Sequence, residues 1–314
     1  MSPFVHIVAD IGGTNARFAF VEEGTNALQG IEVFPCAQFP FLVDAILTYI
    51  QREHVPQLNR VCLAVAGQVE QDWVDLPNNH WAFSRAELQR SLDVPVAVIN
   101  DFSAQVLSLN ALTESDLHWI GDPRPVGGLL RTIVGPGTGL GVSALLPGGE
   151  ILPSEGGHVA FAPLNRHEVD LLDVLWSRYE RVSVERVLSG MGLANLYWAN
   201  CRLGGEEREL PAAEITAGAR AGDSHCCRAV RDFVAILGSV AGDMALMTGA
   251  DDGVYLSGGI LPKMLDLIDE GLLLERFQDK GRYRAFNGRL PLAVVLAEHP
   301  GLIGCVEALQ RSFD

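Results

Sequence analysis

The sequence predicts an α/β fold built as two lobes, and three observations lead to this prediction. A short apolar strand, a glycine–threonine turn and a second apolar strand occur twice, at residues 5–24 and 131–149. Apolar strand patterns alternate with helical patterns along the chain. The length of 314 residues exceeds what one hydrophobic core usually supports, so we expect two domains. Two lobes that each begin with the same hairpin indicate an internal duplication.

The remaining elements follow in a regular order. In the first lobe we predict a strand near 31–36, a helix over 39–53, strands at 60–67 and 95–102, and a helix over 103–112. In the second lobe we predict a long helix over 224–250, a strand at 253–260, a helix led by Pro262, a strand at 291–299 and a last helix from Pro300. The pattern of the helix over 39–53 places four apolar residues on one face, namely Leu42, Ile46, Leu47 and Ile50. Gly238 and Gly242 allow close packing of the long helix.

Composition and charge exclude several classes of function. Hydrophobic residues make up 48% of the chain, which is ample for buried sheets. The net charge of −16 and the absence of a basic cluster argue against nucleic acid and anionic membranes as partners. No apolar stretch reaches membrane-spanning length, and residues 1–10 lack the basic region of a secretory signal. The six cysteines are dispersed, which is typical of reduced thiols in a cytoplasmic protein without a metal cluster.

The two glycine turns are candidate phosphate sites. We expect their glycines to supply positive φ and to let the backbone approach a ligand closely, while Thr14 and Thr138 add hydroxyl groups. Two such turns suggest a clamp on one polyphosphate. Neither turn has the lysine of a Walker loop, and GPGTGLG lacks the spacing of a dinucleotide fingerprint. The alternative is two plain hairpins without a ligand.

Three acidic or amide side chains follow predicted strands. Asp10 precedes the first glycine turn, where a carboxylate could hold Mg²⁺ or cap the turn. Asn100 and Asp101 follow a buried strand, at the edge where α/β sheets bind ligands. Asp101 could cap the next helix, accept a proton from a substrate hydroxyl, or do both.

Further polar residues are candidates for sugar binding. Glu155 and His158 lie three residues apart around two glycines, and a carboxylate with an imidazole suits adjacent hydroxyl groups. The alternative for His158 is an ordinary loop histidine. Residues 78–84 combine amides with Trp81, which could face a sugar ring or anchor the loop to the core. Residues 256–260 form a third glycine turn that could lie against an adenine or a ribose.

Taken together, these segments resemble a known family. ADIGGTNARFAF, INDFSAQ, GPGTGLGV, SEGGHVAFAP, ERVLSG and SGGI, in this order and spacing, closely resemble the bacterial glucokinase family. The resemblance runs from about residue 5 to about residue 310 and includes NNHWAFS and HPGLIG. It implies the two-lobed actin-like ATPase (ribonuclease H-like) fold with an interlobe cleft. The implied domains are residues 1–110 plus 300–314 and residues 111–299.

The resemblance also implies roles for individual residues. Asp101 would be the catalytic base, and it would bind the sugar together with Asn100, Glu155, His158 and Glu185. The nucleotide would be bound by two phosphate turns and an adenosine segment, namely Ala9, Asp10, Ile11, Gly12, Gly13, Thr14, Gly135, Gly137, Thr138, Gly139, Gly258 and Gly259. Asp10 would also hold Mg²⁺, directly or through water. Zinc is not expected, because the cysteine motif of zinc-carrying relatives is missing.

The activity implied by the resemblance is the first step of glycolysis in the cytoplasm, in which MgATP phosphorylates the 6-hydroxyl of glucose. The resemblance further implies a homodimer. Two alternatives remain at this point. One is a kinase of the same fold with another hexose as its substrate. The other is a sugar sensor without enzymatic activity, against which the carboxylate of Asp101 beside intact phosphate turns argues.

Overall fold

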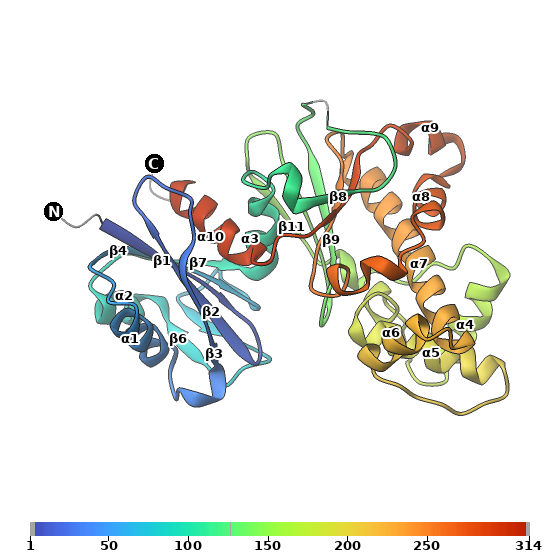
Figure 1. The fold of residues 1–314 in the computed structure, drawn as a ribbon, viewed down its shortest axis with the longest axis horizontal. Helices are drawn as coiled ribbons and strands as arrows, with labels where there is room; N and C mark the ends of the chain where they lie inside the picture. Colours follow the sequence, from blue (N-terminus) through green and yellow to red (C-terminus); the bar gives the residue numbers. More distant parts are fainter. Residues whose placement is uncertain (1–3, 126, 312–314) are drawn as a thin grey trace. The chain divides into compact units, whose positions relative to one another are not determined.

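The structure is a computed structural model that describes residues 4–125 and 127–311. The chain forms two compact units, Met1–Thr113 with Ala297–Asp314, and Glu114–Leu296. Each unit combines a β-sheet with helices (Figure 1). The prediction of an α/β fold is therefore confirmed. Each unit is described here by itself.

The first unit contains a five-stranded sheet in the order β3-β2-β1-β4-β7. Its strands are β1 (Phe4–Ile11), β2 (Asn15–Glu22), β3 (Gln29–Pro35), β4 (Gln57–Val65) and β7 (Val96–Asn100). A small hairpin and four helices complete the unit, namely β5 (Trp73–Asp75), β6 (Ala82–Ser84), α1 (Leu42–Arg52), α2 (Arg85–Leu92), α3 (Asp101–Ser108) and α10 (Pro300–Arg311). The central strand β1 pairs antiparallel with β2 and parallel with β4.

The second unit contains a six-stranded sheet in the order β11-β10-β9-β12-β13-β8. Its strands are β8 (Leu117–Trp119), β9 (Arg131–Pro136), β10 (Leu140–Leu145), β11 (Ile151–Ser154), β12 (Val254–Leu256) and β13 (Leu292–Val295). Its α-helices are α4 (Arg166–Trp176), α5 (Gly190–Leu203), α6 (Ala212–Arg220), α7 (Ser224–Thr248), α8 (Glu270–Gln278) and α9 (Arg284–Asn287). Strand β9 pairs antiparallel with β10 and parallel with β12, as β1 does with β2 and β4. The two sheets thus repeat one topology, as the two hairpins predict.

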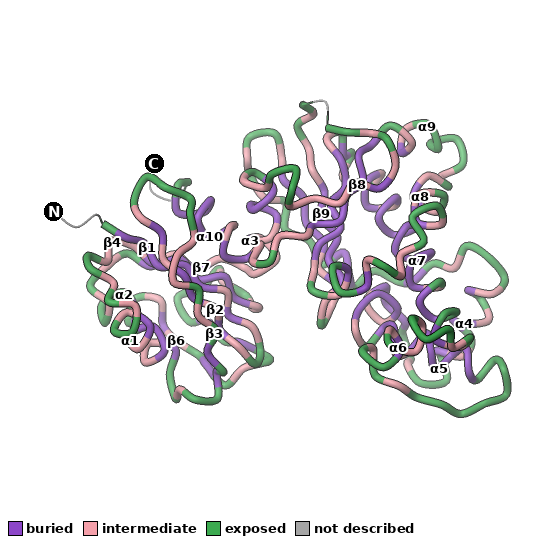
Figure 2. Tube along the Cα trace, viewed as in Figure 1, coloured by how far each residue is buried: buried purple, intermediate pink, exposed green. Residues whose placement is uncertain are grey.

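The alternation of side chains along β1 decides on which face of the sheet each of them lies. Ile7, Ala9 and Ile11 belong to the core that α1 covers. Successive side chains in a strand point to opposite faces, so Asp10 belongs to the other face. Helix α10 lies on that face, because an added Cβ at Gly301 would come within 2.9 Å of Cγ of Asp10. Figure 2 shows that β1 and α10 are largely buried.

Three local expectations need correction. In α1 the buried residues are Leu42, Ala45, Ile46 and Tyr49, whereas Leu47 is 47% exposed. The spacing of this buried set follows the helical period, so Leu47 points away from the core. The segment that begins with Pro262 is a 3₁₀ helix (η5, Pro262–Leu267) rather than an α-helix. The predicted strand at 253–260 is short, because β12 ends at Leu256 and a glycine turn follows.

The small residues of α7 allow close helix packing, as predicted. At Gly238 an added Cβ would lie 2.4 Å from the carbonyl oxygen of Leu273. At Gly242 it would lie 2.3 Å from that of Phe277. Both carbonyl groups belong to α8. The helix begins after the capping residue Asp223 and ends at Gly249, which has a positive φ of 72°.

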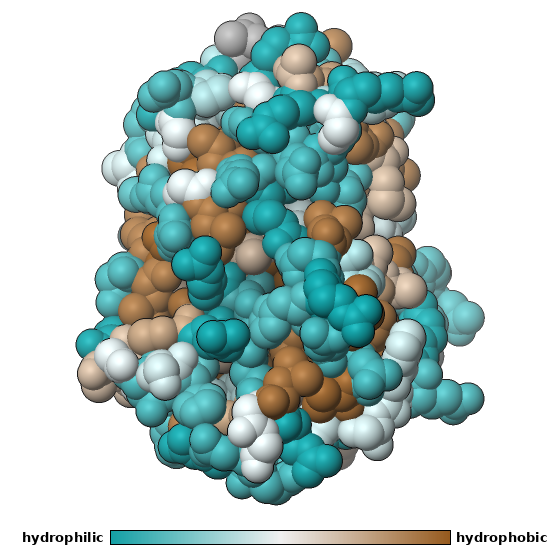
Figure 3. Space-filling model, turned by 90° about the vertical axis from the view of Figure 1, so that its right-hand side faces the viewer, coloured by the Kyte–Doolittle hydropathy of each residue, from teal (hydrophilic) through white to brown (hydrophobic). Residues whose placement is uncertain are grey.

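The surface combines polar and apolar side chains. On the face that Figure 3 draws, hydrophobic patches are separated by hydrophilic side chains. Within residues 4–125 and 127–311, none of the helices has the length and hydrophobicity that are required to cross a bilayer.

Candidate active site

The first glycine turn joins β1 to β2 and is fastened by neighbouring segments. Its backbone closes with a hydrogen bond from the N–H of Gly12 to the carbonyl of Asn15, at 3.0 Å. The side-chain amide of Asn79 donates to the carbonyl of Gly12 at 3.0 Å. An added Cβ at Gly13 would lie 2.7 Å from the carbonyl oxygen of Asn78. The turn is therefore held rigidly, and Thr14 at its end is exposed to solvent.

The reason for glycine in the two phosphate turns differs from our expectation. Gly12, Gly13, Gly137 and Gly139 are described by the structure, but none of them has a positive φ. At Gly13 the requirement is steric, because an added Cβ would lie 2.7 Å from the backbone carbonyl oxygen of Asn78. At Gly139 an added Cβ would lie 2.5 Å from Oε2 of Glu185, so the side chain of Glu185 would have to shift. The expectation of positive φ was wrong for these positions. In the third glycine turn, Gly258 does have a positive φ, of 95°.

Asp10 lies at the carboxyl end of β1, directly before the first turn. Its side chain is 28% exposed, and Oδ2 is 3.6 Å from Nη1 of Arg17. Burial raises the pKa of this carboxyl group, while Arg17 and His299 act in the opposite direction. A partly desolvated carboxylate beside a phosphate turn suits a hard cation.

Asn100 and Asp101 lie at the junction of β7 and α3. Asn100 is the N-cap of α3, and its Oδ1 accepts from the N–H of Phe102 at 2.9 Å and from that of Ser103 at 3.2 Å. Asp101 is the first residue of the helix, and its Oδ1 accepts from the N–H of Phe102 at 2.8 Å. Asn100 is thus the N-cap residue, and Asp101 adds a second acceptor for the N–H of Phe102 in the first turn.

The carboxyl group of Asp101 has a raised pKa. Burial raises the pKa of its carboxyl group to about 6, and the charge of Asp10 adds to this effect. The N–H of Phe102 opposes the shift by donating to the carboxylate. Because β1, β4 and β7 run parallel, their carboxyl ends meet at one edge of the sheet, where the two acids influence each other. A carboxylate with a pKa near neutrality is suited to general base catalysis.

In the second unit, the predicted nucleotide segments lie together. The turn between β9 and β10 is closed by a hydrogen bond from the N–H of Gly137 to the carbonyl of Gly139, at 2.8 Å. The third glycine turn packs against it, since an added Cβ at Gly258 would lie 2.4 Å from the carbonyl oxygen of Pro136. Ser257 donates its N–H to the carbonyl of Val134 at 2.9 Å. The two turns therefore form one continuous surface of backbone.

The three candidate sugar ligands of the second unit lie on two neighbouring segments. Glu155 precedes the 3₁₀ helix η3 (Gly156–His158), His158 ends it, and their side chains are 3.8 Å apart. These side chains are largely exposed, at 91% for Glu155 and 57% for His158. Glu185 belongs to the 3₁₀ helix η4 (Val184–Arg186). An isolated bridge between Ala160 and Ser183 holds the two segments together.

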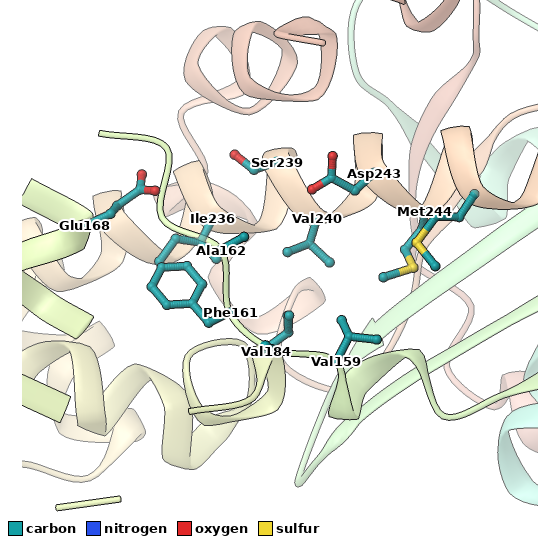
Figure 4. A pocket seen from close by; sticks show the side chains of 12 residues that line it. Val159, Phe161, Ala162, Glu168, Val184, Ile236, Ser239, Val240, Asp243 and Met244 are labelled. Carbon is teal, nitrogen blue, oxygen red and sulfur yellow. The ribbon is translucent and has the colours of Figure 1, made fainter. Parts of the chain in front are cut away.

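A pocket of about 210 Å³ lies behind these two segments (Figure 4). Val159 and Val184 form one wall, next in sequence to His158 and Glu185, and α7 forms another. Its carboxylates are already paired, Glu168 with Arg276 at 2.6 Å and Asp243 with Lys280 at 2.8 Å. The pocket is thus an apolar backing of the segments that carry Glu155, His158 and Glu185 rather than a second polar site.

Residues 78–84 lie beside the first turn, but Trp81 is not available to a sugar. Trp81 is 1% exposed, and its Nε1 donates to the carbonyl of Phe39 at 3.0 Å. The alternative in which Trp81 anchors the loop is therefore the one that the structure supports. Two contacts of the site were not predicted, those of Asn79 with Gly12 and of Gly301 with Asp10. Both join segments far apart in the sequence, and HPGLIG was noted only as part of the family pattern.

Whether the described residues can hold a metal ion depends on which of their carboxylate, imidazole and thiol groups lie together. They contain no group of three or more His, Cys, Asp or Glu side chains arranged to hold a metal ion. A single carboxylate such as Asp10 fits Mg²⁺, which keeps several waters and binds substrate phosphates.

Comparison with known proteins identifies the class. Glucokinase from an Antarctic psychrotroph has a similar structure, with a TM-score of 0.89 and 35% identity, and the match covers 98% of this chain and 99% of that one. Glucokinase from Balamuthia mandrillaris in complex with glucose shares the fold, with a TM-score of 0.82 and 22% identity over 99% of this chain and 94% of that one. The fold and the site thus define an ATP-dependent hexose kinase.

The sequence comparisons narrow the class to one family. The family model described as Glucokinase matches residues 7–312. Glucokinase from Chromohalobacter salexigens is 45% identical, with 97% of each chain covered. Glucokinase from Neisseria gonorrhoeae is 39% identical, over 98% of this chain and 95% of that one. The chain belongs to the glucokinase family, and its function is that of a glucokinase rather than that of a sensor without activity.

Proposed function

We propose that Asp101 is the base that accepts the proton of the glucose 6-hydroxyl while the γ-phosphoryl group of ATP is transferred to that oxygen. The observation that carries this proposal is a half-buried carboxyl group with a pKa of about 6 at the edge of the sheet that also bears the Asp10 turn. In the reaction, the bond from O6 to the γ-phosphorus forms and the bond from that phosphorus to the β,γ-bridging oxygen breaks. The hydroxyl proton moves to Asp101, and ADP leaves.

The other candidate residues would position the two substrates. Asn100, Glu155, His158 and Glu185 would bind the sugar hydroxyls. The two phosphate turns and the third glycine turn would bind the nucleotide through their backbone amides, together with Thr14 and Thr138. We further propose that the two units are the lobes of an actin-like ATPase (ribonuclease H-like) fold and close on the substrates. The repeated sheet topology supports this assignment.

Magnesium belongs to the proposal through Asp10. This carboxylate would hold the ion, directly or through water. When bound, Mg²⁺ neutralises charge on the phosphates of the nucleotide. The contacts of Gly301 and Arg17 with Asp10 would keep the carboxylate directed towards the turn.

A coupled assay of ADP release across glucose, mannose, fructose and N-acetylhexosamines tests the proposal. We expect ADP release to depend on sugar and kcat/KM to be highest for glucose. A higher value for another hexose would reassign the substrate. On the same grounds of family resemblance, we propose a cytoplasmic homodimer, which light scattering and cell fractionation would test.

The pKa of Asp101 predicts the pH dependence of the reaction. A base acts only when it is deprotonated, so kcat/KM for glucose at saturating MgATP should fall about tenfold per pH unit below about pH 6. Above this pH the profile should level off. Calorimetric titration with glucose over the same range serves as the control, because binding does not require the base. A flat profile between pH 5 and 7 would contradict the assigned role.

The exposed carboxylate of Glu155 gives a second prediction. Substituting Glu155→Ala should weaken glucose binding about 10- to 100-fold, because sugar hydroxyls lose a charged acceptor. The Kd for glucose, measured by calorimetry, checks this expectation. Since Glu155 is largely exposed, the melting temperature should stay unchanged. Unaltered glucose affinity would reject Glu155 as a ligand.

A further inference from the structure

Leu140, the first residue of β10 directly after the second phosphate turn, lies between the two segments that carry the candidate sugar ligands. Its N–H donates to Oε2 of Glu185 at 3.0 Å. On its carbonyl side, an added Cβ at Gly157 would lie only 2.0 Å from the oxygen of Leu140. Gly157 is the residue before His158. The backbone of one residue thus contacts both sugar segments.

The carboxylate of Glu185 is seated closely against the turn. An added Cβ at Gly139 would lie 2.5 Å from Oε2 of Glu185, so a side chain at this position would displace the carboxylate from its present place. The contact spans 45 residues of sequence, and it places a candidate sugar ligand directly on a candidate nucleotide turn. Both partners belong to the second unit.

The segment that begins with Glu185 is attached to the turn a second time. Gly190, the first residue of α5, donates its N–H to the carbonyl of Gly137 at 2.9 Å. The hydroxyl of Ser189 donates to the carbonyl of Glu185 at 2.8 Å, which fixes the path of the chain between the two attachment points. Residues 185–190 are therefore hydrogen-bonded to the second phosphate turn at both of their ends.

We propose that Glu185 is a positioning residue for the second phosphate turn in addition to being a sugar ligand, and that it couples sugar binding to nucleotide binding. The inference rests on the proposed function of the turn and of Glu185. Oε2 accepts from the N–H of Leu140, and Oε1 would be the oxygen that binds a sugar hydroxyl. A sugar bound to Oε1 restricts the motion of the carboxylate. The carboxylate then restricts the motion of the second phosphate turn before the nucleotide binds. By linkage, the nucleotide raises sugar affinity by the same factor, and such factors are typically about 5- to 150-fold.

The negative charge of Glu185 also affects nucleotide binding, in the direction opposite to that of its hydrogen bond. The experiment must separate the two effects. A carboxylate beside a phosphate site repels the phosphates, so removing the charge alone would strengthen nucleotide binding. The variants Glu185→Gln and Glu185→Ala both remove the charge, but only glutamine keeps an oxygen that accepts from Leu140. The difference between these two variants therefore reports positioning.

The test is calorimetric titration with MgAMPPNP in the absence of sugar. We expect Glu185→Ala to bind MgAMPPNP about tenfold more weakly than Glu185→Gln, because the turn loses a hydrogen bond to its amide. Glu155→Ala and Glu155→Gln form the control pair and should bind it equally, since the carboxylate of Glu155 pairs with His158 and not with the turn. With glucose present, the ratio of MgAMPPNP affinities with and without sugar should drop towards 1 in Glu185→Ala.

A further variant removes the contact without removing Glu185. In Gly139→Ala the added methyl group would occupy the place of Oε2, so MgAMPPNP binding without sugar should weaken in the same way as in Glu185→Ala. Equal affinities of Glu185→Ala and Glu185→Gln, with an unchanged effect of glucose, would overturn the inference. Failure of the unaltered protein to bind MgAMPPNP would instead overturn the proposed function.

Discussion

Replacing Asp101 by asparagine should lower kcat by about 10²–10⁴-fold and leave glucose affinity nearly unchanged. The amide of asparagine can still hydrogen-bond to a hydroxyl, but it cannot take a proton. The backbone around the substitution should stay in place, because Asn100 rather than Asp101 caps α3. Steady-state kinetics and calorimetric glucose binding on the same preparation separate the two effects.

The stability of this variant provides its control. Burial raises the pKa of Asp101 to about 6 in the folded protein, from 3.8 for an aspartate in water. Ionisation is thus disfavoured in the native state, and this costs about 3 kcal/mol above pH 6 and nothing below about pH 4. Asp101→Asn should therefore melt at a higher temperature at neutral pH. Near-normal kcat in this variant would eliminate Asp101 as the base.

The largest loss of stability is expected at Gly304, where α10 crosses α3. An added Cβ would lie 1.7 Å from the carbonyl oxygen of Ala104 and 2.4 Å from its carbonyl carbon. The backbone cannot yield at this distance without separating the helices, so Gly304→Ala should cost about 3 kcal/mol. In a unit of this size the melting temperature should fall by about 6–12 °C. Because Asp101 begins α3, kcat should fall as well.

Gly271→Ala is the matched control for this prediction. Gly271 is also helical, in the first turn of α8, and an added Cβ there would lie 3.4 Å from Oδ1 of Asp269, an ordinary contact. Alanine favours helix by about 1 kcal/mol over glycine, so this variant should be as stable as the unaltered protein or more stable. Differential scanning calorimetry checks both. Gly304→Ala with an unchanged melting temperature would show that the two helices can separate at no cost.

Much of the fold and part of the candidate site could be predicted because their signals are local. Apolar runs gave the strands, and polar residues directly after a run indicated Asp10, Asn100 and Asp101 as edge residues. The repeated hairpin predicted the repeated sheet topology. The small residues Gly238 and Gly242 indicated close packing of α7, which the carbonyl groups of α8 provide.

The rest depends on contacts between distant segments, which local patterns do not contain. The sequence does not show whether a glycine is needed for a positive φ or for the absence of a side chain. At Gly13 and Gly139 the φ is not positive, and the absence of a side chain is what matters. Glu185 reaches Leu140 across 45 residues, so its local sequence indicated no role. Asn79 contacts Gly12 across 67 residues for a similar reason.

The burial of Asp101 has a consequence for cells whose interior turns acidic. On its proposed role, Asp101 would stop serving as a base when the pH falls through 6, and at the same pH it would cease to weaken the native state. The contribution of this one group to acidification would thus be an inactive enzyme rather than an unfolded one. On return to neutrality, the loss of one proton would restore the base without refolding.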